Sequence, residues 1–220
     1  MTTVYSDTVA ADRVISQIPA AGAIIDVGLP VDIVVSLGKE PDPWTELVSA
    51  QSTQWHYRKG QTEPPSNWRE NDFTEDGTWQ VGQSPIGFSN RDEFTPNTEL
   101  TDMFNNYSTV YTRHSFELNT PDGYKLDKLT LRLFIDDGCI VSINNSELHR
   151  FNVSSGTKNY DDTNGLSYLN ASWKQTELLD VSSLQEGTNI LAIHVLNDKI
   201  SSSDTVVEAE LIAHFVREIE

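Results

Sequence analysis

The segment from Leu129 to Leu148 restricts the fold more than any other part of the chain. Asp136-Asp137-Gly138 divides it with a turn signal, because glycine supplies a positive φ and aspartate tolerates one. A second apolar stretch begins at Cys139 and ends at the polar pair Asn144-Asn145. Before the first turn, every second residue is apolar, which is the period-two pattern of a half-buried strand: Leu129, Leu131, Leu133 and Ile135.

The same alternation of strands and turns continues along most of the chain. Further strands are expected at Tyr111–Phe116, Gly187–Asn197 and Thr205–Phe215, and helix-period segments are nearly absent. The pattern predicts an all-β protein whose residues 53–220 form a jelly-roll-type antiparallel β-sandwich. Its interior is expected to contain Leu129, Leu131, Leu133, Ile135, Ile190 or Leu191, Ile193, Val195, Leu211 and Phe215.

Several motifs of this region resemble the galactose-binding-like β-sandwich family, which includes carbohydrate-binding modules. They are the Asp136-Asp137-Gly138 turn, the Ile143-Asn-Asn-Ser-Glu147 turn, Arg150 and the Pro85-Ile-Gly-Phe88 stretch. The resemblance implies a binding or scaffolding module rather than an enzyme. It also implies that Trp55, Trp68 and Trp79 belong to the hydrophobic interior.

Residues 1–38 form a separate segment. Val14–Gly22 and Val27–Gly38 resemble the C-terminal part of a PASTA repeat, without the helix-bearing first half. Three short strands are expected there, which bury too little surface to be stable alone. We therefore expect this partial PASTA-like segment to pack on the sandwich or on another chain. Residues 39–52 contain two prolines and no period, and are predicted to be a linker.

Composition excludes some function classes. The net charge of −18 makes nucleic-acid binding improbable, because phosphate contacts need clustered Lys and Arg. No stretch approaches the roughly 18 apolar residues of a membrane helix, so no membrane insertion is expected. The first residues lack the pattern of a signal peptide, so reaching an extracellular surface would depend on something else. Cys139 is the single cysteine and is expected to be a buried thiol.

No catalytic signature is recognisable. The sequence lacks a Gly-x-Ser-x-Gly elbow, a His-Glu-x-x-His helix, a Cys-x-x-Cys pair and a phosphate-binding loop. The five histidines are dispersed, and each is expected to be an ordinary strand or loop residue. We therefore predict that the protein is not an enzyme.

Aromatic residues within polar loops indicate a saccharide site instead. Sugar rings stack their C–H faces on aromatic rings, while their hydroxyl groups need polar side chains nearby. The segment 160–173 offers this mixture, although its aromatic rings could instead close the end of the sandwich. The predicted ligand-binding residues are Tyr160, Tyr168, Trp173, Asp137 and Arg150.

Loop carboxylates also suggest a metal site, but the sequence signal for it is weak. No cofactor is required, but a structural calcium ion would prefer carboxylate and carbonyl oxygens. No metal-binding loop of fixed spacing is present, and turn chemistry is the alternative role for Asp136 and Asp137. The candidate ligands are Asp136, Asp161, Asp162 and Asp204.

Two functions remain open. One is a non-catalytic surface module for binding or adhesion that contacts a glycan or a cell-surface polysaccharide. The other is a structural component of a virion, such as a phage capsid decoration, neck or tail-fibre protein. In that case residues 1–38 would mediate assembly of a homo-oligomer or a larger particle.

Overall fold

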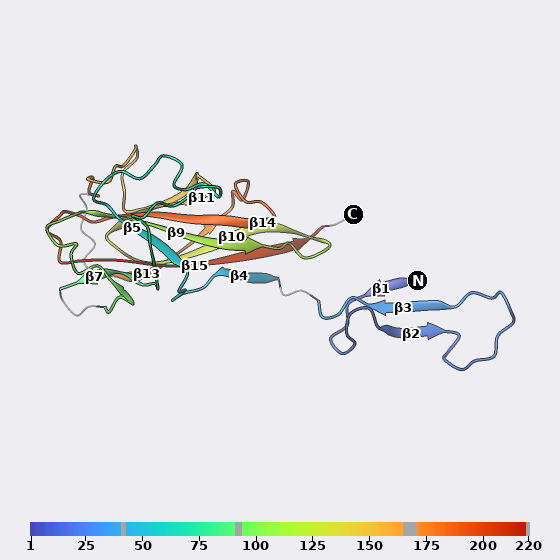
Figure 1. The fold of residues 1–220 in the computed structure, drawn as a ribbon. Coiled ribbons are helices and arrows are strands. Elements are labelled where there is room, and N and C mark those ends of the chain that lie inside the picture. Colours follow the sequence, from blue (N-terminus) through green and yellow to red (C-terminus); the bar gives the residue numbers. More distant parts are fainter. Residues whose placement is uncertain (41–42, 91–93, 165–170, 219–220) are drawn as a thin grey trace. The chain divides into compact units, whose positions relative to one another are not determined.

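The computed structural model describes residues 1–40, 43–90, 94–164 and 171–218 (Figure 1). The chain divides into two compact units, Met1–Pro43 and Trp44–Glu220. Every regular element within the described residues is a strand, which confirms the predicted all-β class. These residues contain no helix long and apolar enough to cross a membrane.

The first unit is a three-stranded sheet. Its strands are β1 (Thr2–Val4), β2 (Val14–Ile18) and β3 (Asp32–Ser36), in the order β1-β3-β2. Strand β3 lies parallel to β1 and antiparallel to β2. Ser36 is the one buried residue among residues 1–40, so this unit has no apolar core of its own.

The second unit contains two six-stranded sheets. In the β10 sheet the order is β13-β10-β15-β7-β8, and β4 pairs with β15 as well. The short strands β7 and β4 share one edge of β15, β7 along Asp204–Val207 and β4 along Leu211–His214. The strands are β4 (Trp44–Val48), β7 (Ile86–Ser89), β8 (Thr98–Glu99), β10 (Tyr124–Asp136), β13 (Ser172–Leu178) and β15 (Asp204–Arg217).

The β14 sheet has the order β12-β11-β14-β9-β5-β6. All of its neighbouring strands are antiparallel. Its strands are β5 (Trp55–Lys59), β6 (Gln80–Gly82), β9 (Thr109–Leu118), β11 (Gly138–Ile143), β12 (Ser146–Phe151) and β14 (Gly187–Leu196).

The main hydrophobic core is formed by side chains of both sheets. All residues predicted for the interior are buried, including both Ile190 and Leu191. These two neighbours point to opposite faces of β14, because side chains alternate along a strand. Leu191 belongs to the main core, whereas Ile190 belongs to a second cluster.

This second cluster covers the outer face of the β14 sheet. It consists of Trp68, Trp79, Tyr111, Ile190 and Ala192. Trp68 and Trp79 come from the long connection between β5 and β6 and stack at a ring distance of 6.1 Å. The three predicted interior tryptophans are thus all buried, but only Trp55 lies in the main core.

The structure agrees with the sequence at the Asn144-Asn145 turn and differs from it in the predicted linker. The Asn144-Asn145 turn is confirmed, since both residues have positive φ (47° and 70°) and join β11 to β12 as a hairpin. At Asp136-Asp137-Gly138 the chain passes from the β10 sheet to the β14 sheet. The predicted linker 39–52 is wrong in part, because it contains β4, whose backbone pairs with β15.

Cys139 is confirmed as a buried thiol. Its side chain lies in the main core and is fully inaccessible. Burial raises the pKa of the thiol to about 12, so it stays protonated and unreactive at neutral pH.

Candidate ligand-binding site

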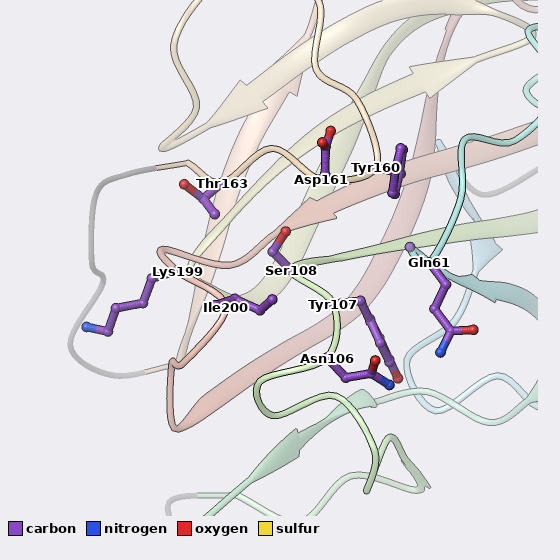
Figure 2. Close-up of a pocket in the computed structure, with 10 residues that line it drawn as sticks. Gln61, Asn106, Tyr107, Ser108, Tyr160, Asp161, Thr163, Lys199 and Ile200 are labelled. Atoms are coloured by element: carbon purple, nitrogen blue, oxygen red, sulfur yellow. The ribbon is translucent and has the colours of Figure 1, made fainter.

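A cavity of about 500 Å³ lies where β5 and β14 end and β9 begins (Figure 2). These three strand ends are neighbours because Lys59 pairs with Val110 and Leu196 pairs with Thr109. We call this the end cavity. Its lining residues come from four loops: Gly60, Gln61, Asn106, Tyr107, Ser108, Tyr160, Asp161, Thr163, Lys199 and Ile200.

Backbone hydrogen bonds hold these loops together. The Asn105 N–H donates to the Ile200 carbonyl at 2.9 Å, and the Asn197 N–H donates to the Ser108 carbonyl at 2.9 Å. The Ser108 hydroxyl donates to the Asp162 carbonyl at 2.8 Å. The cavity is therefore bordered by loops of fixed relative position.

Tyr160 is anchored through its backbone. Its N–H donates to Glu63 Oε2 and its carbonyl accepts from Thr109 Oγ1, both at 2.7 Å. The half-buried ring packs against the second cluster. Because these two anchors are main-chain atoms, both hydrogen bonds can persist when the Tyr160 side chain is truncated.

Tyr107 forms a rigid part of the wall. Its hydroxyl donates to Asp102 Oδ1 at 2.9 Å, and Asp102 also pairs with Lys59 Nζ at 2.7 Å. Burial, and then the neighbouring Asp102 carboxylate, raise the pKa of Tyr107 well above its ordinary value. The phenol therefore stays neutral at every physiological pH.

Asp161 and its neighbour Asp162 have different surroundings. Asp162 Oδ2 accepts from the Asn159 N–H at 2.7 Å and so shapes the loop. Asp161 is exposed and lines the cavity. Lys199 also lines it, but its side chain extends away from the other lining residues in Figure 2, and its Nζ lies 3.2 Å from Asp198 Oδ2.

The five predicted ligand-binding residues do not form one site. Tyr160 lines the end cavity, whereas Tyr168 lies outside the described residues. Asp137 is buried, and its Oδ2 accepts from the Asp198 N–H at 2.8 Å, so it stabilises a loop. Arg150 belongs to β12 and binds Glu147.

Trp173 occupies yet another surface. It lies on β13 opposite Phe134, with the Arg132 guanidinium 5.0 Å from its ring centroid. Phe134 alternates with core residues of β10, which places Trp173 on the outer face of the β10 sheet. The prediction that Trp173 shares a site with Tyr160 is therefore wrong.

The predicted metal ligands are also scattered. Asp136 and Asp204 are buried at the ends of β10 and β15, and Asp204 Oδ1 accepts from Ser203 Oγ at 2.8 Å. Asp161 and Asp162 belong to the loop at the end cavity. Nowhere in the described part of the chain do three His, Cys, Asp or Glu side chains gather in a way that could hold a metal ion.

Sequence reasoning missed most of the residues that line the cavity. Gln61, Asn106 and Ser108 stand in irregular segments far apart in the sequence. The available signal was their position next to strand ends, since residues flanking neighbouring antiparallel strands meet at one edge of a sheet. That signal requires the strand order, which the sequence does not reveal.

No family model matches this chain, and no curated protein matches it. Its fold resembles part of a Bacteroides uniformis β-glucuronidase, with a TM-score of 0.47, 15% identity, and coverage of 77% of this chain and 18% of that one. A Bifidobacterium dentium β-glucuronidase complexed with coumarin-3-O-glucuronide gives a TM-score of 0.45 and 14% identity, covering 80% and 31%. A glycosyl hydrolase family 2 member from Bacteroides cellulosilyticus gives a TM-score of 0.43 and 13% identity, and the match covers 80% of this chain and 21% of that one. The chain spans less than a third of each.

Proposed function

We propose that the protein is a non-catalytic carbohydrate-binding module and that the end cavity holds the saccharide. The observation that carries this proposal is that Tyr160 lines one cavity together with the polar residues Gln61, Asn106 and Asp161. An aromatic face and several hydrogen-bonding groups are what a sugar ring requires. The cavity volume of about 500 Å³ is within the range of ordinary ligand pockets.

The number of carboxylates that line the cavity favours binding over hydrolysis. Glycoside hydrolysis ordinarily uses a pair of carboxyl groups on either side of the scissile bond. Among the described lining residues, Asp161 supplies the single carboxylate. A hydroxyl group of a bound sugar would donate a hydrogen bond to the Asp161 carboxylate, and the cavity lining as described offers no second acid.

Tyr160→Ala and Gln61→Ala test this proposal. Each variant should weaken binding to whichever polysaccharide the wild-type protein retains in affinity electrophoresis, because each removes a contact inside the cavity. Loss of one aromatic stack or one hydrogen bond should lower affinity by about three- to tenfold. Trp173→Ala is the matched control, since it removes an exposed aromatic ring from a different sheet.

Three results would contradict the proposal. One is failure of the wild-type protein to bind any member of a broad glycan array. Another is equal binding by Tyr160→Ala, Gln61→Ala and wild type. The third is turnover of chromogenic glycosides that is lost in Asp161→Asn, which would indicate an enzyme.

A second candidate function is assembly into a particle through the N-terminal unit. The observation that favours it is the exposure of apolar side chains there, since a contiguous exposed apolar surface often marks an interface. The exposed large apolar residues of this unit are Met1, Val4, Val14, Ile15, Ile18, Ile24, Ile25, Val27, Leu29, Val31 and Leu37.

Light scattering of the full chain and of a chain lacking residues 1–43 tests this second candidate. Assembly through the N-terminal unit should give an oligomer that becomes a monomer after the deletion. Ile24→Asp and Val27→Asp should have the same effect, because they place charges on the two most exposed apolar positions. A monomeric full chain would exclude self-assembly through this unit.

A further inference from the structure

A second pocket, of about 350 Å³, lies on the outer face of the β14 sheet. We call it the face pocket. Its floor consists of the buried residues Ile140 and Ser142 of β11 and His194 of β14. Its walls come from Trp68 and Arg69, from Glu147 and Arg150 of β12, and from Gly156, Thr157 and Lys158.

The strand register explains why a pocket forms there. Arg150, Ile140, His194 and Tyr111 follow one another across β12, β11, β14 and β9 on the same face of the sheet. The connection that carries Trp68 covers this row at Tyr111, where the two rings lie 5.1 Å apart. The connection does not cover His194, Ile140 and Arg150. Its edge at Trp68 therefore forms one wall of the pocket.

The charge of the face pocket is opposite to that of the whole protein. Arg69, Arg150 and Lys158 line it together with a single carboxylate, Glu147, whereas the chain as a whole carries −18. Glu147 is already bound by Arg150, whose Nε and Nη2 donate to its two oxygens at 2.6 and 2.8 Å. Arg150 Nη1 also donates to the Ser154 carbonyl at 2.7 Å, so Arg150 holds the wall in place.

The other two cations form no ion pair with a described residue, although Arg69 interacts electrostatically with Glu147. Arg69 donates from Nε to Asn145 Oδ1 at 3.0 Å, and its terminal nitrogens donate no hydrogen bond to any described residue. Lys158, which is half-buried, has neither a hydrogen bond nor an ion pair within the described part of the chain. The nearby Glu70 accepts from Asn145 at 3.0 Å rather than from Arg69.

His194 adds an independent indication of a ligand. It is 5% exposed, it lines the pocket, and its Nε2 is buried without a hydrogen-bond partner in the described structure. Burial, and then the charges of Arg69, Arg150 and Lys158, lower the pKa of His194 to about 3. A neutral imidazole can donate one hydrogen bond, and leaving a buried polar atom without a partner is unfavourable.

We propose that the face pocket binds an oxyanion, namely a carboxylate, sulfate or phosphate group, through Arg69, Lys158 and His194. The guanidinium presents parallel N–H groups that match two oxygens of such an anion, and the ammonium adds a second positive charge. The His194 tautomer with a proton on Nε2 supplies a neutral donor from the floor. This site is separate from the end cavity, and the proposal does not depend on saccharide binding there.

Isothermal titration of the full chain with sodium sulfate, sodium phosphate and sodium glucuronate tests the proposal, with glucose as the uncharged comparison. At least one anion should bind, and added sodium chloride should weaken it, because salt screens charge. Arg69→Gln and Lys158→Gln should each lower its affinity by about tenfold, since each removes a charge-assisted hydrogen bond. Lys128→Gln is the control for net charge, because Lys128 pairs with Glu177 in the other sheet.

The three probes also distinguish the source of the anion. Similar affinities for sulfate, phosphate and glucuronate would show that the pocket takes a free oxyanion. Tighter binding of glucuronate, without binding of glucose, would show that it recognises the anion on a sugar. In both cases the ¹⁵N resonances of the His194 ring should shift on binding. Gln61→Ala, which changes an exposed residue of the end cavity, should leave anion binding unchanged, and this separates the two sites.

The proposal would be overturned by any of three results. The first is absence of binding for all three anions. The second is equal affinity in wild type and in the Arg69→Gln/Lys158→Gln double variant, with unchanged circular dichroism. The third is an equal loss of affinity in Lys128→Gln, which would attribute binding to overall charge.

Discussion

The imidazole of His194 stacks on the ring of Tyr111, with the centroids 4.2 Å apart and the planes inclined by 18°. The two residues are direct partners across β14 and β9. Tyr111 belongs to the second cluster on the outer face of the β14 sheet, whereas His194 lines the face pocket beside it. The stack therefore fixes the ring that forms the floor of the pocket.

The burial of His194 should make the stability of the folded chain sensitive to acid. The pKa of His194 is about 3 in the folded chain, against 6.5 for an unperturbed histidine. Between these values the unfolded chain binds a proton that the folded chain does not, so stability falls as the pH falls through this window. The contribution of His194 should approach about 1.4 kcal/mol per pH unit.

Urea denaturation of wild type and His194→Gln at several pH values between 6.5 and 4.5 measures this contribution. The variant should lose less stability per pH unit, even if its stability at neutral pH is lower because the stack is gone. Parallel pH profiles for the two proteins would contradict the assignment. His149→Gln is a suitable comparison, since burial lowers the pKa of His149 too, but its side chain is only half-buried.

The centre of the main core provides a second prediction. Leu131 is fully buried between the sheets, so Leu131→Ala should cost about 2–5 kcal/mol by removing packed methyl groups. Leu131→Asp should prevent folding, because it introduces an unpaired charge into the core. Lys128→Ala, which removes only a surface ion pair, should change stability by less than about 1 kcal/mol. Thermal denaturation followed by circular dichroism provides the measurement.

Local pattern was sufficient to predict the strands and the core but not their assembly. The alternation from Leu129 to Ile135 identifies one buried face, and Asn144-Asn145 identifies a hairpin, because both depend on neighbours in sequence. The passage from one sheet to the other at Asp137 depends on which strand lies beside β10. Trp68 and Ile190 likewise meet only because a distant connection folds over β14.

The Pro85-Ile-Gly-Phe88 stretch yields a third prediction. Gly87 lies against β15 so closely that an added Cβ would overlap the Thr205 carbonyl oxygen and lie 2.8 Å from Val206 Cα. Gly87→Ala should therefore separate β7 from β15 and cost about 1–3 kcal/mol, as overpacking does. Gly77→Ala is the matched control, because no atom lies within 4 Å of its added Cβ. Equal melting temperatures for the two variants would disprove this account of Gly87.

The candidate sites were less predictable than the fold. Tyr160 and Arg150 were both identified from the sequence, yet they line different pockets. Arg69, Lys158 and His194 were not identified, because they come from three separate segments and each looks ordinary among its sequence neighbours. Their common location follows from the strand order and from the path of two loops, which are long-range properties of the chain.

Glu208 is a buried carboxyl group at a gap in the pairing along one edge of β15. It lies on β15 between the segments that pair with β7 and β4, it is 6% exposed, and its Oε1 accepts from the Gln51 N–H at 2.7 Å. Burial, and then the charge of Glu210, raise the pKa of its carboxyl above the ordinary value, despite the Gln51 hydrogen bond. The ionised form is thus less favourable in the folded chain than in the unfolded chain.

Glu208→Gln should therefore stabilise the protein at neutral pH. A carboxyl with a raised pKa contributes stability below its unfolded-state pKa, and this contribution is lost as the pH rises through the folded-state pKa. The amide oxygen can still accept from Gln51, while the buried charge is removed. The melting temperature of the variant should exceed that of wild type at pH 7, and the difference should disappear in acid. Glu46→Gln, at an exposed position of β4, is the matched control, because it removes the same charge without removing a buried carboxylate. A variant that is less stable than wild type at both pH values would show that the Glu208 carboxylate supports the sheet instead.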